Sequence, residues 1–151
     1  MKGDKMKKSA LAVVFLLALL LLCSCNKGEQ SNMELSDNKT VTFVNRVNET
    51  DLWILPKTEK NLKTTVWGTA AASKVKTGES RQVPLCDPGD GGLYLIRMID
   101  TDSFYYSAND VALEAGWTIE IKQNDTHQVT AEVKDENGAL KKTYEVFSAR
   151  L

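Results

Sequence analysis

The chain has 151 residues, with 19 Lys and Arg against 20 Asp and Glu, one His, three Cys and three Pro. This length suffices for one domain and is too short for two of ordinary size. The formal net charge of −1 argues against a strongly basic nucleic-acid-binding protein and against an acidic, disordered chain. The charge is unevenly distributed, because residues 1–24 contain four lysines and one acidic residue and the rest of the chain is acidic.

The N-terminal segment has the pattern of an export signal. Lys2 to Lys8 form a positive region, and an unbroken apolar run follows from Ala10 to Leu22. The 13 residues of this run match the hydrophobic segment of a signal peptide. They fall short of the roughly 20 residues that span a bilayer. We therefore expect residues 1–24 to be a signal peptide.

The end of this run resembles the lipobox of bacterial lipoprotein precursors, in which Leu, a tolerant position and a small residue precede the modified Cys. Leu22, Cys23, Ser24 and Cys25 match that pattern in order. Cys23 fits less well, because the residue before it is the large Leu22. The resemblance implies that signal peptidase II cuts before Cys25 and that the Cys25 thiol carries a diacylglycerol. The alternative is an ordinary secretory peptide followed by an unmodified cysteine.

Lipidation of Cys25 would fix both the location and the cysteine chemistry. Several acyl chains anchor a protein firmly, whereas a single chain gives only marginal membrane binding. The mature domain would keep only Cys86, so no intramolecular disulfide forms and stability comes from a packed core. Asn26 is not the Asp that retains enteric lipoproteins in the inner membrane, so the outer membrane is favoured if the cell is Gram-negative.

Residues 25–39 are polar and without a sustained period, which indicates a lipidated Cys followed by a flexible tether. The texture of residues 40–151 is that of strands, with β-branched and aromatic runs separated by turn residues. Pro84 suggests that its strand lies at an edge, and Leu93–Asp100 is apolar on both faces, as in a central strand. The predicted strands before the last hairpin span residues 40–47, 51–56, 80–86, 93–100, 103–107 and 118–122.

The last hairpin has the strongest local signal, because Asn137–Gly138 suits a two-residue type I′ turn. Centring the hairpin on this turn predicts cross-strand pairs that make one face apolar and the other polar. It also places Lys134 opposite Lys141, a repulsion that a bulge would relieve. The predicted pairs are Val129 with Val146, Thr130 with Glu145, Ala131 with Tyr144, Glu132 with Thr143, and Val133 with Lys142.

These elements predict an all-β fold, a single antiparallel immunoglobulin-like β-sandwich of about seven to eight strands. Two stretches depart from the pattern. Residues 57–78 are expected to be a long connection with room for a helical turn, and residues 108–116 fit either a helical turn or a strand end.

The domain also resembles a loosely defined group of small β-sandwich domains in bacterial exported proteins. The resemblance implies the fold and no activity, because the group has none established. The stretches that carry it are Val41–Asn45, Trp67-Gly68, Thr77–Ser80, Leu95–Asp100 and Ala112–Gly116.

Candidate chemistry is sparse. A nucleophilic enzyme would need Cys86 beside the single histidine, His127, and nothing local brings the two together. There is no serine elbow, no zinc-spaced set of ligands and no phosphate-binding loop, so we expect no catalytic residues and no cofactor. Asp87 and Asp90, and Asp100 and Asp102, raise a calcium hypothesis, but neither pair has EF-hand spacing and turn formation explains both. We expect no metal site.

The most interesting surface is the connection at residues 57–81, which carries six basic groups against two acidic ones with Trp67 in its middle. A basic patch with an aromatic ring is suited to a polysaccharide, a lipid headgroup or a protein partner. The overall acidity argues against nucleic acid. The competing interpretation is a solvated loop whose Trp67 packs back onto the domain. The tentative ligand-binding residues are Lys60, Lys63, Trp67 and Lys74.

The sequence therefore predicts a non-enzymatic lipoprotein, anchored to the bacterial cell envelope, whose β-sandwich binds an unidentified protein or polysaccharide. The alternative is a structural or accessory subunit of an envelope complex, docked by strand addition at an exposed edge such as Arg81–Cys86.

Overall fold

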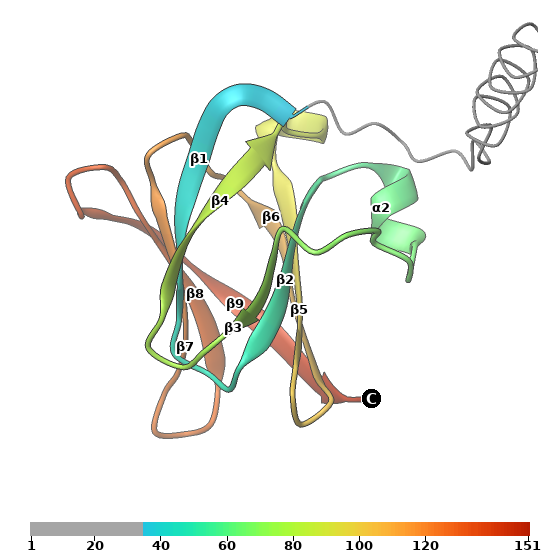
Figure 1. Ribbon diagram of the computed structural model, residues 1–151, viewed down its shortest axis with the longest axis vertical. Coiled ribbons are helices and arrows are strands. Elements are labelled where there is room, and N and C mark those ends of the chain that lie inside the picture. The colour runs from blue at the N-terminus through green and yellow to red at the C-terminus, as the bar shows by residue number, and fades with distance from the viewer. Residues whose placement is uncertain (1–34) are drawn as a thin grey trace, which may run out of the picture. The chain divides into compact units, whose positions relative to one another are not determined.

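The computed structural model describes residues 35–151, and this part of the chain consists almost entirely of β-strands (Figure 1), which confirms the all-β class. Within residues 35–151, helical structure is limited to the short α2 (Glu59–Lys63) and one 3₁₀ turn, η1 (Asp90–Gly92). Among the described residues, no helix is long and apolar enough to cross a membrane. The strands are β1 (Leu35–Asn45), β2 (Thr50–Pro56), β3 (Ala72–Val75), β4 (Ser80–Cys86), β5 (Tyr94–Asp100), β6 (Phe104–Val111), β7 (Thr118–Gln123), β8 (Val129–Lys134) and β9 (Leu140–Arg150).

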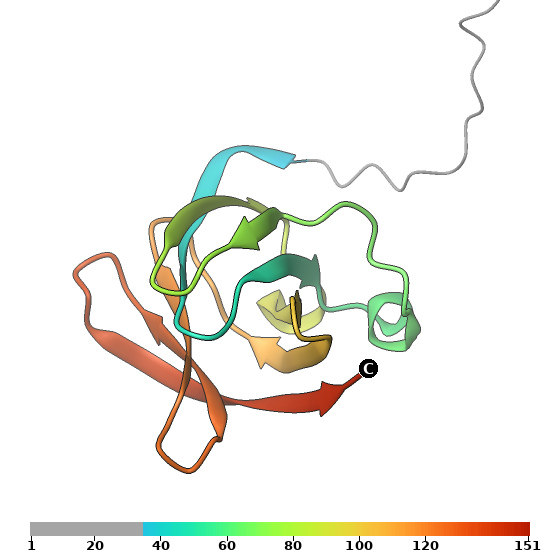
Figure 2. The same ribbon diagram turned by 60° about the horizontal axis from the view of Figure 1, so that its bottom comes forward.

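The nine strands form one mixed sheet in the order β3-β2-β5-β6-β9-β8-β7-β1-β4. All neighbours are antiparallel except β1 and β7, which are parallel. The sheet curls around its core into a nearly barrel-shaped domain (Figures 1 and 2). The predicted antiparallel sandwich of seven to eight strands is therefore wrong in its finer description. The physical reason is the long β9, whose first half pairs with β8 and whose second half pairs with β6, so that one strand joins what would otherwise be two sheets.

The core lies inside the curled sheet and is supplied by alternate residues of nearly every strand, as the two-residue period of a strand requires. Phe43 of β1 is fully buried, and Ile119 and Ile121 of β7 face it from the neighbouring strand. Met98 of β5 is also fully buried in the other half of the sheet. Truncating a buried phenylalanine such as Phe43 to alanine typically lowers the free energy of unfolding by about 3–5 kcal/mol.

The β8–β9 hairpin confirms all five predicted cross-strand pairs. The type I′ turn is wrong, because among the residues with positive φ Gly138 is present (φ 79°) and Asn137 is not. The main-chain N–H groups of Asn137 and Ala139 instead donate to the Asp135 carboxylate, at 2.9 and 3.0 Å. The register then shifts by one residue, so that Lys134 faces Leu140 and the expected repulsion from Lys141 is relieved.

Strand β4 is an end strand of the sheet, as Pro84 predicted. The predicted bounds of Ser80–Cys86 are also confirmed. Strand β1, which pairs with β4, begins at Leu35, five residues before the boundary expected at residue 40. Strand β3 was not expected, because its four residues lie in the connection that the sequence marks as irregular.

The central position of β5 is confirmed, since β2 and β6 flank it and both Leu95 and Ile96 are buried. Arg97 is buried as well, at 5% exposure, and burial lowers the pKa of its guanidinium. Its Nη1 donates to the Ala108 carbonyl at 3.2 Å and its Nη2 to the Asn109 side chain at 2.9 Å. The register of β5 and β6 shifts at this point, so Arg97 supplies hydrogen bonds that the bulged strand cannot obtain from the ladder.

One corner carries the chain from β1 to β2, and the Asn45 side chain organises it. Asn45 is completely buried. Its Nδ2 donates to the carbonyls of Asn48 and Val75, both at 2.8 Å, and its Oδ1 accepts the N–H of Val47 at 3.1 Å. The bond to Val75 connects the corner to β3, the strand at one end of the sheet. A buried amide with these partners is strongly specified, because any unpaired group there would stay desolvated.

Glu120 on the outer face of β7 makes stability depend on pH. Hydrogen bonds from Lys134 and then Arg46 lower the pKa of its carboxyl below the ordinary value of 4.5. A lowered folded-state pKa contributes stability above the unfolded pKa, and this stability is lost as the pH falls through the folded value. We expect Glu120→Gln to reduce the free energy of unfolding by about 0.5–1 kcal/mol at pH 7. In urea titrations below both the folded-state and the unfolded-state pKa of Glu120, the native chain and the variant should have the same free energy of unfolding.

The matched control is Glu145→Gln, at an exposed position of β9 that forms no ion pair within residues 35–151. A loss of stability for Glu120→Gln that persisted unchanged into acid would show that the ion pairs are not its source.

Candidate functional site

The connection between β2 and β4 begins at a tight backbone junction. The Lys57 N–H donates to the Leu93 carbonyl at 3.0 Å, and the Lys57 carbonyl accepts the Asp90 N–H at 2.7 Å. A Cβ at Gly89 would lie 1.9 Å from the Lys57 carbonyl oxygen, so only glycine fits. The Lys57 ammonium also pairs with Asp110 of β6 at 2.5 Å. The start of the connection is thus fixed to the rim of the sheet.

Two predicted site residues, Lys60 and Lys63, lie on α2. The Thr58 hydroxyl caps this helix by accepting the Asn61 N–H at 3.1 Å. Lys63 forms an ion pair with Glu59, one helical turn earlier. Because α2 is short and buries no residue, its place depends on these local bonds and on the segment that follows.

Trp67 packs back onto the outer face of the sheet, in the arrangement that the competing interpretation described. Its ring stacks on Tyr105 of β6, with centroids 5.6 Å apart, and meets Trp53 of β2 edge-on at 5.4 Å. Each indole N–H is used: that of Trp67 donates to the Thr64 carbonyl and that of Trp53 to the Gly68 carbonyl, both at 3.1 Å. We call Trp53, Trp67 and Tyr105 the aromatic cluster. It fixes the middle of the connection to the sheet.

Lys74, the fourth predicted residue, belongs to β3. This strand lies apart from α2 (Figure 1). Its φ of 52° places it in the left-handed region at the irregular pairing of β2 with β3, and its N–H donates to the Asp51 carboxylate at 2.8 Å. The structure therefore brings Lys60, Lys63 and Trp67 into one half of the connection and leaves Lys74 in the other.

The charge of the connection is partly compensated. Lys57 and Lys63 are paired with acids, and Arg81 binds Glu79 at 2.7 Å. The hydrogen bond from Arg81 lowers the pKa of the Glu79 carboxyl. The basic groups of residues 57–81 for which the described chain shows no ion pair are Lys60, Lys74 and Lys76.

Cys86 and His127 lie near opposite ends of β1. Cys86 is on the neighbouring strand β4, and His127 is in the turn after the other neighbour, β7. Strand β1 pairs Leu35 with Cys86 of β4, whereas its other end, Asn45, pairs with Ile121 of β7, the strand that leads to His127. The two side chains therefore form no dyad. The Cys86 thiol is buried, and burial raises its pKa. His127 is exposed in the β7–β8 turn, with a φ of 64°.

Asp100, one of the four aspartates behind the calcium hypothesis, uses its carboxylate to bind the turn between β5 and β6. Asp100 Oδ1 accepts the N–H groups of Asp102 and Phe104 at 2.9 and 2.8 Å, and its Oδ2 accepts the Tyr106 hydroxyl at 2.8 Å. Burial and this hydrogen bond raise the pKa of Tyr106. Across residues 35–151, no three His, Cys, Asp or Glu side chains are placed to hold a metal ion.

Sequence reasoning missed two members of the aromatic cluster, Trp53 and Tyr105. The alternation of side chains within a strand could have placed both residues on the outer face of the sheet. What the sequence lacked was the strand order, which places β2 and β6 on either side of β5 and so brings both rings within reach of Trp67.

Comparison with protein-family models, with curated proteins and with solved structures finds no match.

We expect Trp67→Ala to release the connection while leaving the barrel folded. The variant removes both ring contacts and one indole hydrogen bond, and each aromatic pair contributes about 0.5–1.5 kcal/mol beyond the area it buries. Limited proteolysis should show new cleavage between residues 57 and 71. The control is Val66→Ala, one residue earlier, where the side chain is 80% exposed. Equal protease resistance of Trp67→Ala and the native chain would contradict an anchoring role for the ring.

Proposed function

We propose that this chain is a non-enzymatic lipoprotein of a bacterial cell envelope, anchored through Cys25, whose domain binds a protein partner through the connection after β2. The lipobox supports the anchor, although Cys25 lies outside the described residues. A soluble partner-binding domain held to a membrane by lipid needs no spanning segment of its own.

The observation that carries this proposal is an ordered loop that displays apolar side chains to solvent. Leu62 at the end of α2 is 45% exposed and Val66 is 80% exposed. The Thr64 hydroxyl accepts the Val66 N–H and donates to the Val66 carbonyl, both at 3.1 Å, which holds the turn that presents this side chain. Fixing a loop before binding lowers the entropic cost of association.

The chemistry of this surface favours a protein over a polysaccharide. Stacking on sugar requires a free aromatic face, and Trp67 already uses its rings in contacts with Trp53 and Tyr105. Exposed aliphatic groups beside a cation suit a partner with an apolar patch bordered by acidic residues. Lys60, which shows no ion pair among the described residues, supplies a cation on α2, the helix that also carries Leu62.

A second candidate function is the accessory subunit docked by strand addition. The position of β4 at the end of the sheet favours it. Pro84 limits it, because the pairing of β1 with β4 directs Gln82 and Pro84 to the open side, and Pro84 has no N–H to donate. Added strands would have to use Ser80–Gln82.

The two functions are separated by co-purification after chemical cross-linking in the native envelope. We expect the double variant Leu62→Ser with Val66→Ser to reduce the cross-linked partner at least about tenfold, as loss of a central apolar contact does. Charge reversal of Lys60, Lys63 and Lys74 should also weaken capture, mainly through the association rate. The matched control is Leu140→Ser, because Leu140 is 56% exposed and lies in the β8–β9 hairpin.

Retention of the partner by both loop variants would contradict the proposed site. If Gln82→Pro abolished capture instead, the strand-addition role would replace it, since that change removes an outward N–H from β4.

A further inference from the structure

The curled sheet does not close completely, and the gap lies between β2 and β4. Strand β3 pairs with β2 only at Thr50 and Leu52. Beyond Leu52 the edge of β2 faces β4, and the two strands pack without forming a ladder. We call this unpaired stretch the seam.

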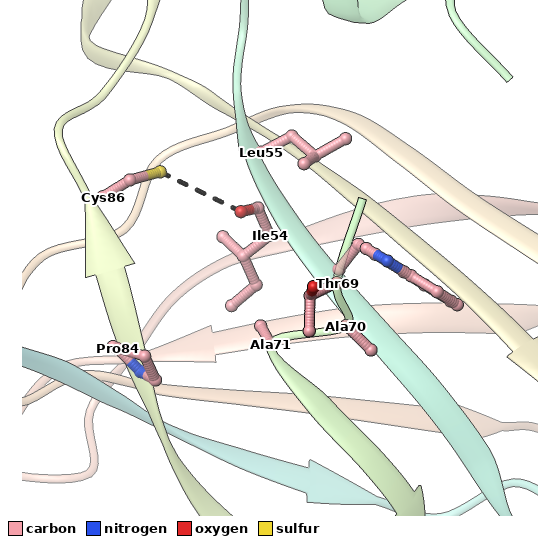
Figure 3. Close-up of a pocket in the computed structure, with 8 residues that line it drawn as sticks. Ile54, Leu55, Thr69, Ala70, Ala71, Pro84 and Cys86 are labelled. Carbon is pink, nitrogen blue, oxygen red and sulfur yellow. Dashed lines mark hydrogen bonds between the residues drawn. The ribbon is translucent and has the colours of Figure 1, made fainter. Parts of the chain in front are cut away.

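A pocket of about 250 Å³ occupies the seam (Figure 3). Buried Ile54, Leu55 and Cys86 contribute to its wall, whereas Thr69 and Pro84 are exposed at its rim. No charged side chain lines it. Ala70 and Ala71 line it with small side chains, which leaves the space open. The complete lining is Trp53, Ile54, Leu55, Thr69, Ala70, Ala71, Pro84 and Cys86.

On the β2 side of the pocket, the main chain offers little hydrogen bonding. The Leu52 carbonyl accepts the Ala71 N–H at 2.8 Å, so residues of the same phase, Ile54 and Pro56, direct their main-chain groups to the seam. The Ile54 carbonyl accepts the Cys86 thiol at 3.9 Å, and the Pro56 carbonyl accepts the Asn61 side chain at 2.9 Å. Pro56 has no N–H.

On the β4 side, Pro84 lines the pocket and likewise has no N–H. The Cys86 carbonyl is already taken by the Tyr94 hydroxyl at 2.8 Å. The walls therefore lack the row of donors and acceptors that an added peptide strand requires. Among the described residues, the Ile54 N–H is the main-chain donor left on the β2 side, so a ligand with many polar groups would lose most of its hydration without replacement.

We propose that the seam pocket binds the hydrocarbon chain of a small single-chain amphiphile, with the polar end at the exposed rim beside Thr69. An apolar cavity of about 150 Å³ in another protein remains dry and takes up benzene, so a larger one with apolar walls accommodates a larger hydrocarbon group. The flanking strands hold the space open, because β5 fixes β2 and β1 fixes β4. This site is separate from the displayed residues Leu62 and Val66, so each proposal can fail alone.

The probe for this site is 1-octanol, and the protein is residues 33–151. Residues 35–151 of this segment form a compact domain with its own hydrophobic core, and a cooperative thermal transition is checked first. We expect saturable NMR shifts of the Ile54 and Leu55 methyl groups and slower reaction of Cys86 with methyl methanethiolsulfonate. Cys86 is the single thiol of this segment. The control probe is 1,8-octanediol. Whichever end enters the pocket, this molecule must bury one hydroxyl, so it should bind at least about tenfold more weakly than 1-octanol.

The matched variants are Ala71→Leu, which fills the pocket, and Ala115→Leu, which makes the same change at an exposed position outside it. Ala71→Leu should abolish the shifts at the concentration that saturates the native protein, and Ala115→Leu should preserve them. Ala70→Leu serves if Ala71→Leu fails to fold. Absence of saturable shifts in the native protein, equal binding of the two probes, or equal binding by the two variants would each overturn the proposal.

Discussion

The buried side chain of Asn45 is the constraint on which the arrangement of this domain depends. The chain must leave β1, in one half of the curled sheet, and enter β2, in the other half, within the few residues between Asn45 and Thr50. The amide closes that corner and also reaches the carbonyl of Val75 on β3. Asn48 extends the polar contacts by donating to the Asp102 carboxylate at 2.9 Å, in the turn between β5 and β6. One corner therefore ties β1 to β3, at one end of the sheet, and to the turn between β5 and β6.

The surface features follow from that arrangement. Because β2 enters with Leu52 and Ile54 inward, Trp53 faces outward, where Trp67 and Tyr105 pack against it. The aromatic cluster then holds the connection that displays Leu62 and Val66. The short β3 leaves the rest of the β2 edge unpaired, and the seam pocket fills that space. Both proposed sites thus arise from how β2 is placed, one from its outward face and one from its open edge.

Local patterns predicted the strands well, because alternation and turn residues act over a few positions. The pairs of the β8–β9 hairpin and the edge position of Pro84 are examples. The strand order was out of reach, because it depends on contacts distant in sequence, such as the parallel pairing of β1 with β7. Strand β3 was missed because it is short and irregular. Lys74 within it has a positive φ, and the four residues show no strand-like alternation in the sequence. The seam pocket lies between elements, so no local pattern reports it.

The most direct test of the organising role of Asn45 is amide hydrogen exchange of Asn45→Ala, with Asn137→Ala as the exposed control. Loss of the three hydrogen bonds of the Asn45 side chain should lower the free energy of unfolding by about 2–4 kcal/mol. Protection should fall both at the β1–β2 corner and at the β3 residues around Val75, which are distant in sequence. If exchange increased only at residues 45–50 while β3 kept its native protection, the corner would be a local turn and the account would be contradicted.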